Sequence, residues 1–230
     1  MLARLFRLSY LGPLILAAGC VHPAAVTPTA GFENSTLDAV TAASQASGPS
    51  GHEVLRFHWR FNDGQVQVSG NGAARVAAPD SLRADIGAVL GLGRATVIVA
   101  GDSVAAQPAN AVERLFPDRF ALWAALGYLR IPPAVRRVER GTFEAQVVWR
   151  LTHEDGQVTL FTVQDGQLAR VTREQSGRTV QQLVLTRDPA SGRVARAKLS
   201  DYARGVELAI DITAREPSAA FPPEIWRLRP

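Results

Sequence analysis

The most reactive side chain in the sequence is a single thiol, Cys20, the only cysteine among 230 residues. Because no second thiol is present, the chain cannot form an internal disulfide. The cysteine follows an uncharged, mainly apolar stretch at 8–19, and Arg4 and Arg7 precede that stretch. A basic start, a short apolar core and a small-residue exit are typical of a secretory signal. We therefore predict a signal peptide over residues 1–19, which is too short to serve as a transmembrane anchor.

The residues that lead to the thiol, LAAGC at 16–20, resemble the bacterial lipobox. The lipobox resemblance implies cleavage before Cys20 and lipidation of its sulfur, which anchors the chain to membrane lipid. Ala17 stands where the motif usually has a bulky aliphatic residue, with Leu16 one place earlier. Val21 follows the cysteine, whereas an aspartate there would, by resemblance to enterobacterial lipoproteins, imply retention at the inner membrane. We expect the periplasmic face of the outer membrane; the alternative is an ordinary secretion signal with an incidental cysteine.

The other residues that could do chemistry are dispersed. No two of the histidines have the spacing of metal ligands, so we predict no metal site. Ser103 follows Asp102 but lacks the glycine-x-serine-x-glycine elbow of many hydrolases, and a surface turn explains both residues. We therefore predict no catalytic residues and no cofactor. The histidines are His22, His52, His58 and His153.

Composition argues against a nucleic-acid partner. The full chain has a formal net charge of +4, and removal of the signal takes away two arginines and no acid. The remaining arginines are scattered and do not form the one-sided basic stripe of a phosphate-backbone surface. The length after the signal suits one domain, and we expect a monomer.

The start of the mature chain is predicted to be a tether. Residues 20–34 carry prolines, alanines and one glycine and have no periodicity, which indicates a lipidated linker. The folded domain is expected over 35–230. It begins with a short helix that Ser35 or Thr36 can cap and that ends before Gly48.

An alternating pattern typical of β-strands follows and predicts a meander. At 55–61 apolar residues alternate with arginine and histidine, and a turn at 62–64 reverses the chain. A helical pattern at 108–129 interrupts the meander. The fold class is thus mainly β with a helical insertion, with roughly ten antiparallel strands. Further strands are predicted at 73–78, 82–90, 95–100, 103–107, 142–152, 157–164, 167–175, 178–187, 193–201 and 206–214.

Two stretches carry a family resemblance, LRADIGAVLGLGRATVIVAGDSV at 82–104 and FPDRFALWAALGYLRIP at 116–132. The first is similar to the strand, glycine-leucine hairpin and next strand of LolB-like outer-membrane lipoproteins, and the second is similar to their helical insertion. These proteins belong to the LolA/LolB superfamily of lipoprotein carriers and insertases. The resemblance implies an unclosed antiparallel β-barrel with helices covering the mouth and an apolar cavity for acyl chains.

The same resemblance suggests a cargo and a membrane contact. It implies acyl chains or lipoproteins as cargo and makes a periplasmic carrier protein a candidate partner. The insertase form projects an apolar hairpin residue towards the membrane, and Leu92 occupies the matching place in this sequence. The glycines on both sides of Leu92 leave its side chain little cover. Leu92 could equally fold back onto the barrel rim.

Seven apolar residues could either line the implied cavity or fill a sealed core. The sequence leaves three interpretations open: a lipoprotein that binds acyl chains in lipoprotein or lipid transfer, a structural or assembly lipoprotein of the cell envelope with a filled barrel and no ligand, and a hydrolase. An internal cavity would support the first, and a solid core the second. The seven are Phe57, Trp59, Phe61, Phe120, Trp123, Val147 and Trp149.

Overall fold

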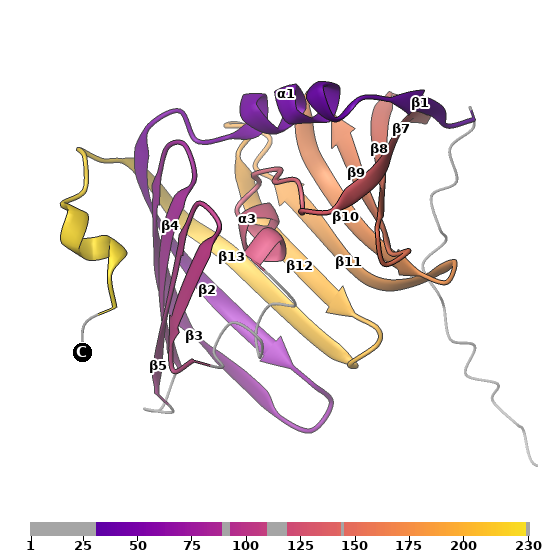
Figure 1. Cartoon of the computed structure of the whole chain (residues 1–230). Helices are drawn as coiled ribbons and strands as arrows, with labels where there is room; N and C mark the ends of the chain where they lie inside the picture. The colour runs from indigo at the N-terminus through magenta and orange to yellow at the C-terminus, as the bar shows by residue number, and fades with distance from the viewer. Residues whose placement is uncertain (1–30, 89–92, 110–118, 144, 229–230) are drawn as a thin grey trace, which may run out of the picture.

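The computed structural model describes residues 31–88, 93–109, 119–143 and 145–228, and their strands form one curved antiparallel sheet. Across the sheet the order of the 13 strands is β1-β7-β8-β9-β10-β11-β12-β13-β2-β3-β4-β5-β6. The two end strands, β1 and β6, do not pair with each other, so the barrel is unclosed (Figure 1). In chain order the strands are β1 (Glu33–Ser35), β2 (His52–Asn62), β3 (Gln67–Ala77), β4 (Ser81–Ala88), β5 (Arg94–Ala100), β6 (Ser103–Gln107), β7 (Val135–Phe143), β8 (Gln146–His153), β9 (Val158–Gln164), β10 (Gln167–Gln175), β11 (Arg178–Arg187), β12 (Val194–Asp201) and β13 (Val206–Pro217).

The predicted fold class is confirmed as mainly β and unclosed, but the predicted strand number of about ten is too low. The expected strand at 142–152 is in fact the end of β7 and nearly all of β8. β7 was missed because Arg136, Arg137, Glu139 and Arg140 break its alternation. β1 was missed because it is three residues long and polar; it pairs with β7, and it starts shortly before the expected domain boundary at residue 35.

Strand β2 shows how the alternating pattern builds the concave face. Leu55, Phe57 and Trp59 are buried, and the residues between them are exposed. Because successive side chains of a strand point to opposite faces, every second residue enters the interior. β2 pairs with β13 on one side and β3 on the other, which joins the two halves of the sheet.

The helix α1 (Leu37–Ser47) runs along one end of the half-barrel (Figure 1). Its N-cap is Thr36, whose side chain accepts a hydrogen bond from the Ala39 amide at 3.2 Å. The helix buries Val40 and Ser44. The Ser44 hydroxyl donates to the Leu129 carbonyl at 2.8 Å, which ties α1 to the chain that follows the helical insertion.

The second helix, α3 (Arg119–Ala125), lies inside the concave face between the two halves of the sheet (Figure 1). Gly127 ends this helical segment with a φ of +94°, and a Cβ at that position would lie 2.7 Å from Val194 Cγ2. Glycine is therefore required there both by the backbone and by the close approach of β12. Within the described residues, no helix is long and apolar enough to cross a bilayer.

Candidate ligand-binding site

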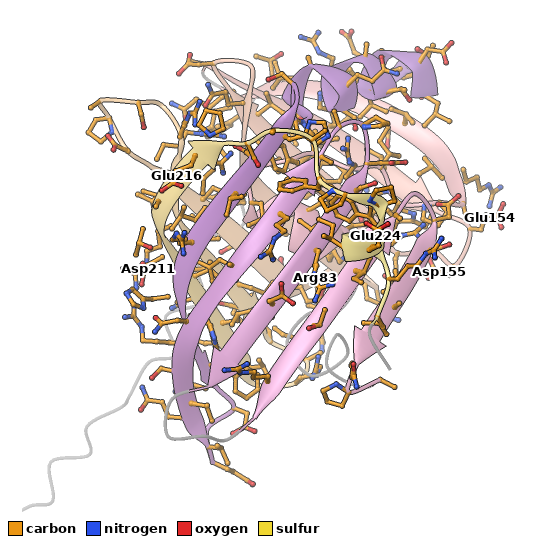
Figure 2. All side chains as sticks on the ribbon, turned by 90° about the vertical axis from the view of Figure 1, so that its left-hand side faces the viewer. Arg83, Glu154, Asp155, Asp211, Glu216 and Glu224 are labelled. Atoms are coloured by element: carbon orange, nitrogen blue, oxygen red, sulfur yellow. The ribbon has the colours of Figure 1, made fainter. Side chains whose placement is uncertain are left out.

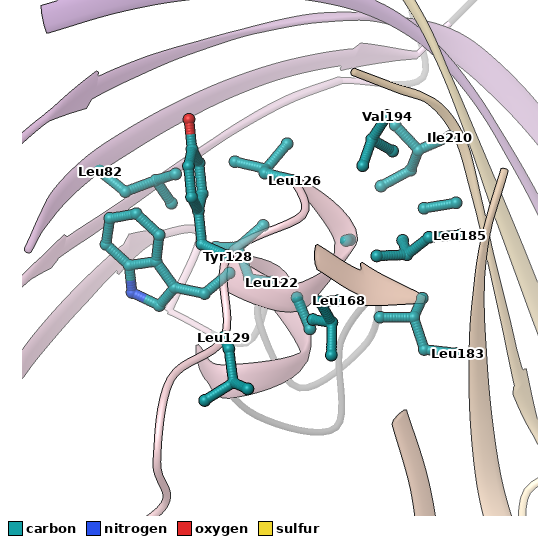
Figure 3. Packing of buried hydrophobic residues seen from close by; sticks show 14 of the residues in the cluster. Leu82, Leu122, Leu126, Tyr128, Leu129, Leu168, Leu183, Leu185, Val194 and Ile210 are labelled. Atoms are coloured by element: carbon teal, nitrogen blue, oxygen red, sulfur yellow. The ribbon is translucent and has the colours of Figure 1, made fainter. Parts of the chain in front are cut away.

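The concave face is the candidate site, and α3 occupies it. Leu122, Trp123, Ala124 and Ala125 are all buried, as are the following Leu126 and Leu129. Figure 3 shows this segment between strand residues of both halves, with Leu82 on one side and Leu183, Leu185 and Ile210 on the other. A short helix thus fills the space that a half-barrel would otherwise leave open.

An apolar void lies on the side of α3 that faces β2–β4. Its volume is about 20 Å³, which is room for about one water molecule. The void borders aromatic rings and two alanines, Ala74 and Ala84. The small side chains of these alanines leave the space unfilled. Its lining consists of Phe57, Trp59, Ala74, Ala84, Ile86, Leu122, Leu126, Leu208 and Ile210.

A second void of about 20 Å³ lies between α3 and strands β9–β12. Phe120 of α3 faces Phe161 of β9 and Leu183 of β11 across it. Arg173 and Gln181 add polar groups at its border. The two voids are small, so the described residues around α3 pack closely on both of its sides.

Three arginines fix the helix and the loop after it. Arg119 donates through Nη2 to the Asp102 carboxylate at 2.8 Å. The guanidinium of Arg130 lies 4.7 Å from the centroid of the Trp123 ring and donates to the Pro79 carbonyl. Arg215 of β13 donates to the Leu126 carbonyl at 3.1 Å. α3 is therefore held at its start, at its middle and just beyond its end.

Burial lowers the pKa of Arg130, and the nearby Asp80 carboxylate partly restores it. Burial likewise lowers the pKa of Arg215, against the raising effect of Glu53, which accepts from Arg215 at 3.0 Å. Both guanidinium groups are thus partly desolvated, so the attachments of this loop are shielded from water.

The structure brings together only some of the predicted lining residues. Phe57 and Trp59 line the first void and Phe120 lines the second. Trp123 is 3% exposed and packs edge-on against Tyr128, with ring centroids 5.8 Å apart. Three further candidates belong to the same apolar cluster but border neither void: Phe61, Val147 and Trp149.

Two predicted sites lie outside the described residues. These are Cys20, with the lipidation site, and Leu92, with its membrane-facing hairpin. The described neighbours of the hairpin are β4 and β5, which pair in register up to Gly87 and Arg94.

The structure places the other reactive side chains apart. Ser103 opens the edge strand β6, and the carboxylate of Asp102 pairs with Arg119. His153 contacts the Thr159 hydroxyl at 2.9 Å. Among the described residues no group of three histidine, cysteine, aspartate or glutamate side chains could hold a metal ion.

A larger, polar pocket lies at the end of the half-barrel near the C-terminus of α1. Its volume is about 330 Å³. Arg187 of β11 and Arg215 of β13 line it, together with Arg193 in the turn before β12. Sequence reasoning missed this pocket because its arginines are far apart in the sequence and resemble the chain's many other arginines; nothing in their local spacing marks them.

Comparison with solved structures identifies the class of fold. The structure matches a LolA superfamily protein from Nitrosomonas europaea with a TM-score of 0.52 and 8% identity, over 84% of this chain and 98% of that one. It also matches a domain from Vibrio parahaemolyticus described as an outer membrane lipoprotein-sorting protein, with a TM-score of 0.50 and 8% identity, over 82% and 94% of the two chains. The predicted resemblance to the LolA/LolB superfamily is thus confirmed at the level of the fold.

Sequence comparison adds no closer relative. No protein-family model matches the sequence. A search of curated proteins likewise finds no match.

Proposed function

We propose that the protein is a lipid-anchored lipoprotein on the periplasmic face of the outer membrane that binds acyl chains in its concave face, in the transfer or insertion of lipoproteins or lipids. The observation that carries the proposal is the seven-residue helix α3 inside an apolar half-barrel. An acyl chain would take the place of α3 and its loop, because both present apolar surface to the same strands. The fold likeness to a lipoprotein-sorting domain supports this choice of cargo.

The proposal requires that α3 can move out of the concave face. The attachments of α3 to the rest of the chain indicate where its release would begin. Among the described contacts at its start is the ion pair of Arg119 with Asp102, whose side chain is fully exposed. Exposed ion pairs contribute little, about 0.2–1 kcal/mol. Release of this end would connect the two small voids into one apolar space that extends along β2–β4 and β9–β12.

Uptake of an environment-sensitive fluorescent fatty acid by the mature chain, residues 20–230, tests the proposal. Wild-type protein should bind the probe, and Arg119→Gln should raise uptake because it loosens one end of α3. The matched control is Arg60→Gln, which breaks an ion pair with Asp211 on β13 without touching α3. If folded wild-type protein and Arg119→Gln both exclude the probe, acyl binding in the concave face is wrong.

A second function is favoured by the close packing itself. Voids of about 20 Å³ are too small for an acyl chain. A structural or assembly lipoprotein of the cell envelope, with a filled barrel, would need no larger space and would act through its surface. Absence of probe uptake, together with absence of lipid in mass spectra of the purified protein, would support this alternative.

The lipid anchor is a separate part of the proposal. Acyl chains on Cys20 contribute about 0.8 kcal/mol per buried methylene, so two or three chains would hold the protein on a bilayer. Cys20→Ser should therefore release the protein from membranes or stop its maturation. If the variant matures normally and still fractionates with outer membranes, lipidation is not the anchor. Leu92 remains our candidate for the residue that enters the bilayer, and a periplasmic carrier remains the candidate partner.

A further inference from the structure

The polar pocket near α1 differs from both apolar voids in size and in charge. It offers about 330 Å³ and opens at the rim formed by Gln167, Ser191 and Arg193, all of which are exposed. Among the described residues that line it, none is an aspartate or a glutamate.

Arg187 carries a positive charge into this pocket without a carboxylate partner among the described ion pairs. Its Nη1 donates to the Gly192 carbonyl at 2.9 Å and its Nη2 to the Leu168 carbonyl at 2.7 Å. These bonds fix the guanidinium between the turn before β12 and the start of β10. Burial lowers the pKa of Arg187, and the positive charge of Arg215 lowers it further. An anion in the pocket would relieve this repulsion.

Arg215 adds a second charge that its own partner only partly satisfies. Its Nη1 donates to Glu53 at 3.0 Å and to the Tyr128 hydroxyl at 3.1 Å. Its Nε is buried and has no hydrogen-bond partner among the described residues. Because this nitrogen has almost no accessible surface, Arg215 offers a ligand in the pocket its positive charge rather than this donor.

We propose that this pocket binds a phosphate group. Arginine forks match the geometry of phosphate oxygens, and Arg187, Arg193 and Arg215 approach the pocket from three different segments. The side chains of Gln167 and Ser191 supply further donors at the rim. Three guanidinium groups with one nearby carboxylate, Glu53, leave an excess of positive charge that suits a phosphate better than a singly charged carboxylate.

The same chemistry recognises a free phosphate and the phosphate of a lipid headgroup. Leu126 lines both this pocket and the apolar void beside β2–β4, so an amphiphile could place its headgroup here and a chain in the interior. The inference itself does not depend on acyl binding, because a phosphate without a chain tests the pocket alone.

Isothermal titration of the mature chain, residues 20–230, with inorganic phosphate and with short-chain phosphatidic acid tests the inference, and short-chain phosphatidylcholine serves as the neutral-headgroup comparison. Wild-type protein should bind inorganic phosphate. Arg193→Gln should weaken binding about two- to fivefold, because its guanidinium is exposed. Arg187→Gln should weaken it more. The matched control is Arg178→Gln, an exposed arginine at the other end of β11, which should bind like wild type.

Arg187 also supports the turn at Gly192 and the start of β10, so Arg193→Gln is the deciding variant if Arg187→Gln does not fold. Equal affinity for phosphate and phosphatidic acid would identify the ligand as a free phosphate. Much tighter binding of phosphatidic acid than of phosphate or phosphatidylcholine would identify a lipid headgroup. The inference is overturned if wild-type protein binds neither inorganic phosphate nor phosphatidic acid. It is also overturned if Arg178→Gln weakens binding as much as the pocket variants do.

Discussion

The two faces of strands β2–β4 are built from the same alternation and have opposite chemistry. On the concave face Phe57, Trp59 and Leu82 are buried against α3. On the convex face Asp85 of β4 accepts from Arg75 at 2.7 Å and from Arg83 at 2.9 Å. Figure 2 views this outer face, where Arg83 lies beneath the C-terminal segment.

The convex face also carries the last element of the chain. Arg83 donates to the Ile225 carbonyl at 2.8 Å and so holds the 3₁₀ helix η2 (Pro223–Trp226) against β4. Trp226 packs edge-on against Phe221, with ring centroids 5.9 Å apart. Thus Trp123 lies on a short helix in the concave face, and Trp226 lies on a short helix against the convex face. Of these two tryptophans, only Trp123 is fully buried.

The two faces therefore contribute differently to the stability of the protein. Burial of large apolar side chains contributes about 1.5–3 kcal/mol each, whereas half-exposed ion pairs contribute about 1 kcal/mol or less. Stability should therefore depend mainly on the packing of α3 in the concave face. A cargo that displaces α3 must replace that packing with its own apolar surface, and it leaves the outer ion pairs untouched.

The largest effect is expected from Trp123→Ala. Trp123 is 3% exposed and contacts Tyr128 and Arg130, so its loss should lower the free energy of unfolding by about 3–5 kcal/mol. Trp226→Ala makes the same change on the convex face and should cost only about 1 kcal/mol. Urea denaturation followed by circular dichroism measures both. Equal losses in the two variants would contradict the proposed division between the faces.

The sequence predicted those features that depend on local pattern. The period-two alternation placed Leu55, Phe57 and Trp59 on one face of a strand, and β2 has them buried there. The predicted break between the strands at 157–164 and 167–175 is confirmed as a turn, because Asp165 and Gly166 both have positive φ between β9 and β10. Apolar spacing at 108–129 indicated a helix, and α3 lies within that range.

The sequence could not predict features that depend on how distant segments meet. Whether Phe57 and Trp59 border a cavity or fill a core depends on where α3 lies, and no local pattern encodes this. The polar pocket likewise requires Arg187 of β11 and Arg215 of β13 to converge across β12. Strand β7 was hidden because its charged residues depend on partners from other strands: Glu139 is buried beside Arg150 of β8, and Arg140 lies over the Trp149 ring.

A smaller effect is expected from Gly72→Ala, which adds one methyl group to the concave face. Gly72 of β3 lies opposite Phe57, and a Cβ there would lie 2.3 Å from the Phe57 ring. The ring must move towards the adjacent void, which should cost about 1–3 kcal/mol. Gly87→Ala on β4 is the control, because its nearest neighbour would be 3.6 Å away. A thermal melt in which both variants resemble wild type would show that the concave face is less tightly packed than described.

The smallest effect concerns Asp85 on the convex face. Burial raises the pKa of Asp85, but hydrogen bonds from Arg83 and Thr96 and the charges of Arg83 and Arg75 outweigh it, so the pKa lies below its ordinary value. A carboxyl whose pKa is lower in the folded state stabilises the protein above its unfolded-state pKa of about 3.9, and this stabilisation is lost as the pH falls through the folded-state pKa.

Asp85→Asn should therefore lower the free energy of unfolding by about 1 kcal/mol or less at neutral pH, because Asp85 is about one-third exposed and solvent screens its ion pairs. The difference from wild type should shrink below pH ~4 as the wild-type carboxyl takes up a proton. Asp165→Asn, in an exposed turn, provides the control and should leave the profile unchanged. Denaturation midpoints measured between neutral and acidic pH make the comparison. The difference between Asp85→Asn and wild type could instead persist undiminished into strong acid. That result would mean that the charge of the Asp85 carboxylate does not stabilise the convex face. The contrast between an ionic outer face and an apolar inner face would then rest on packing alone.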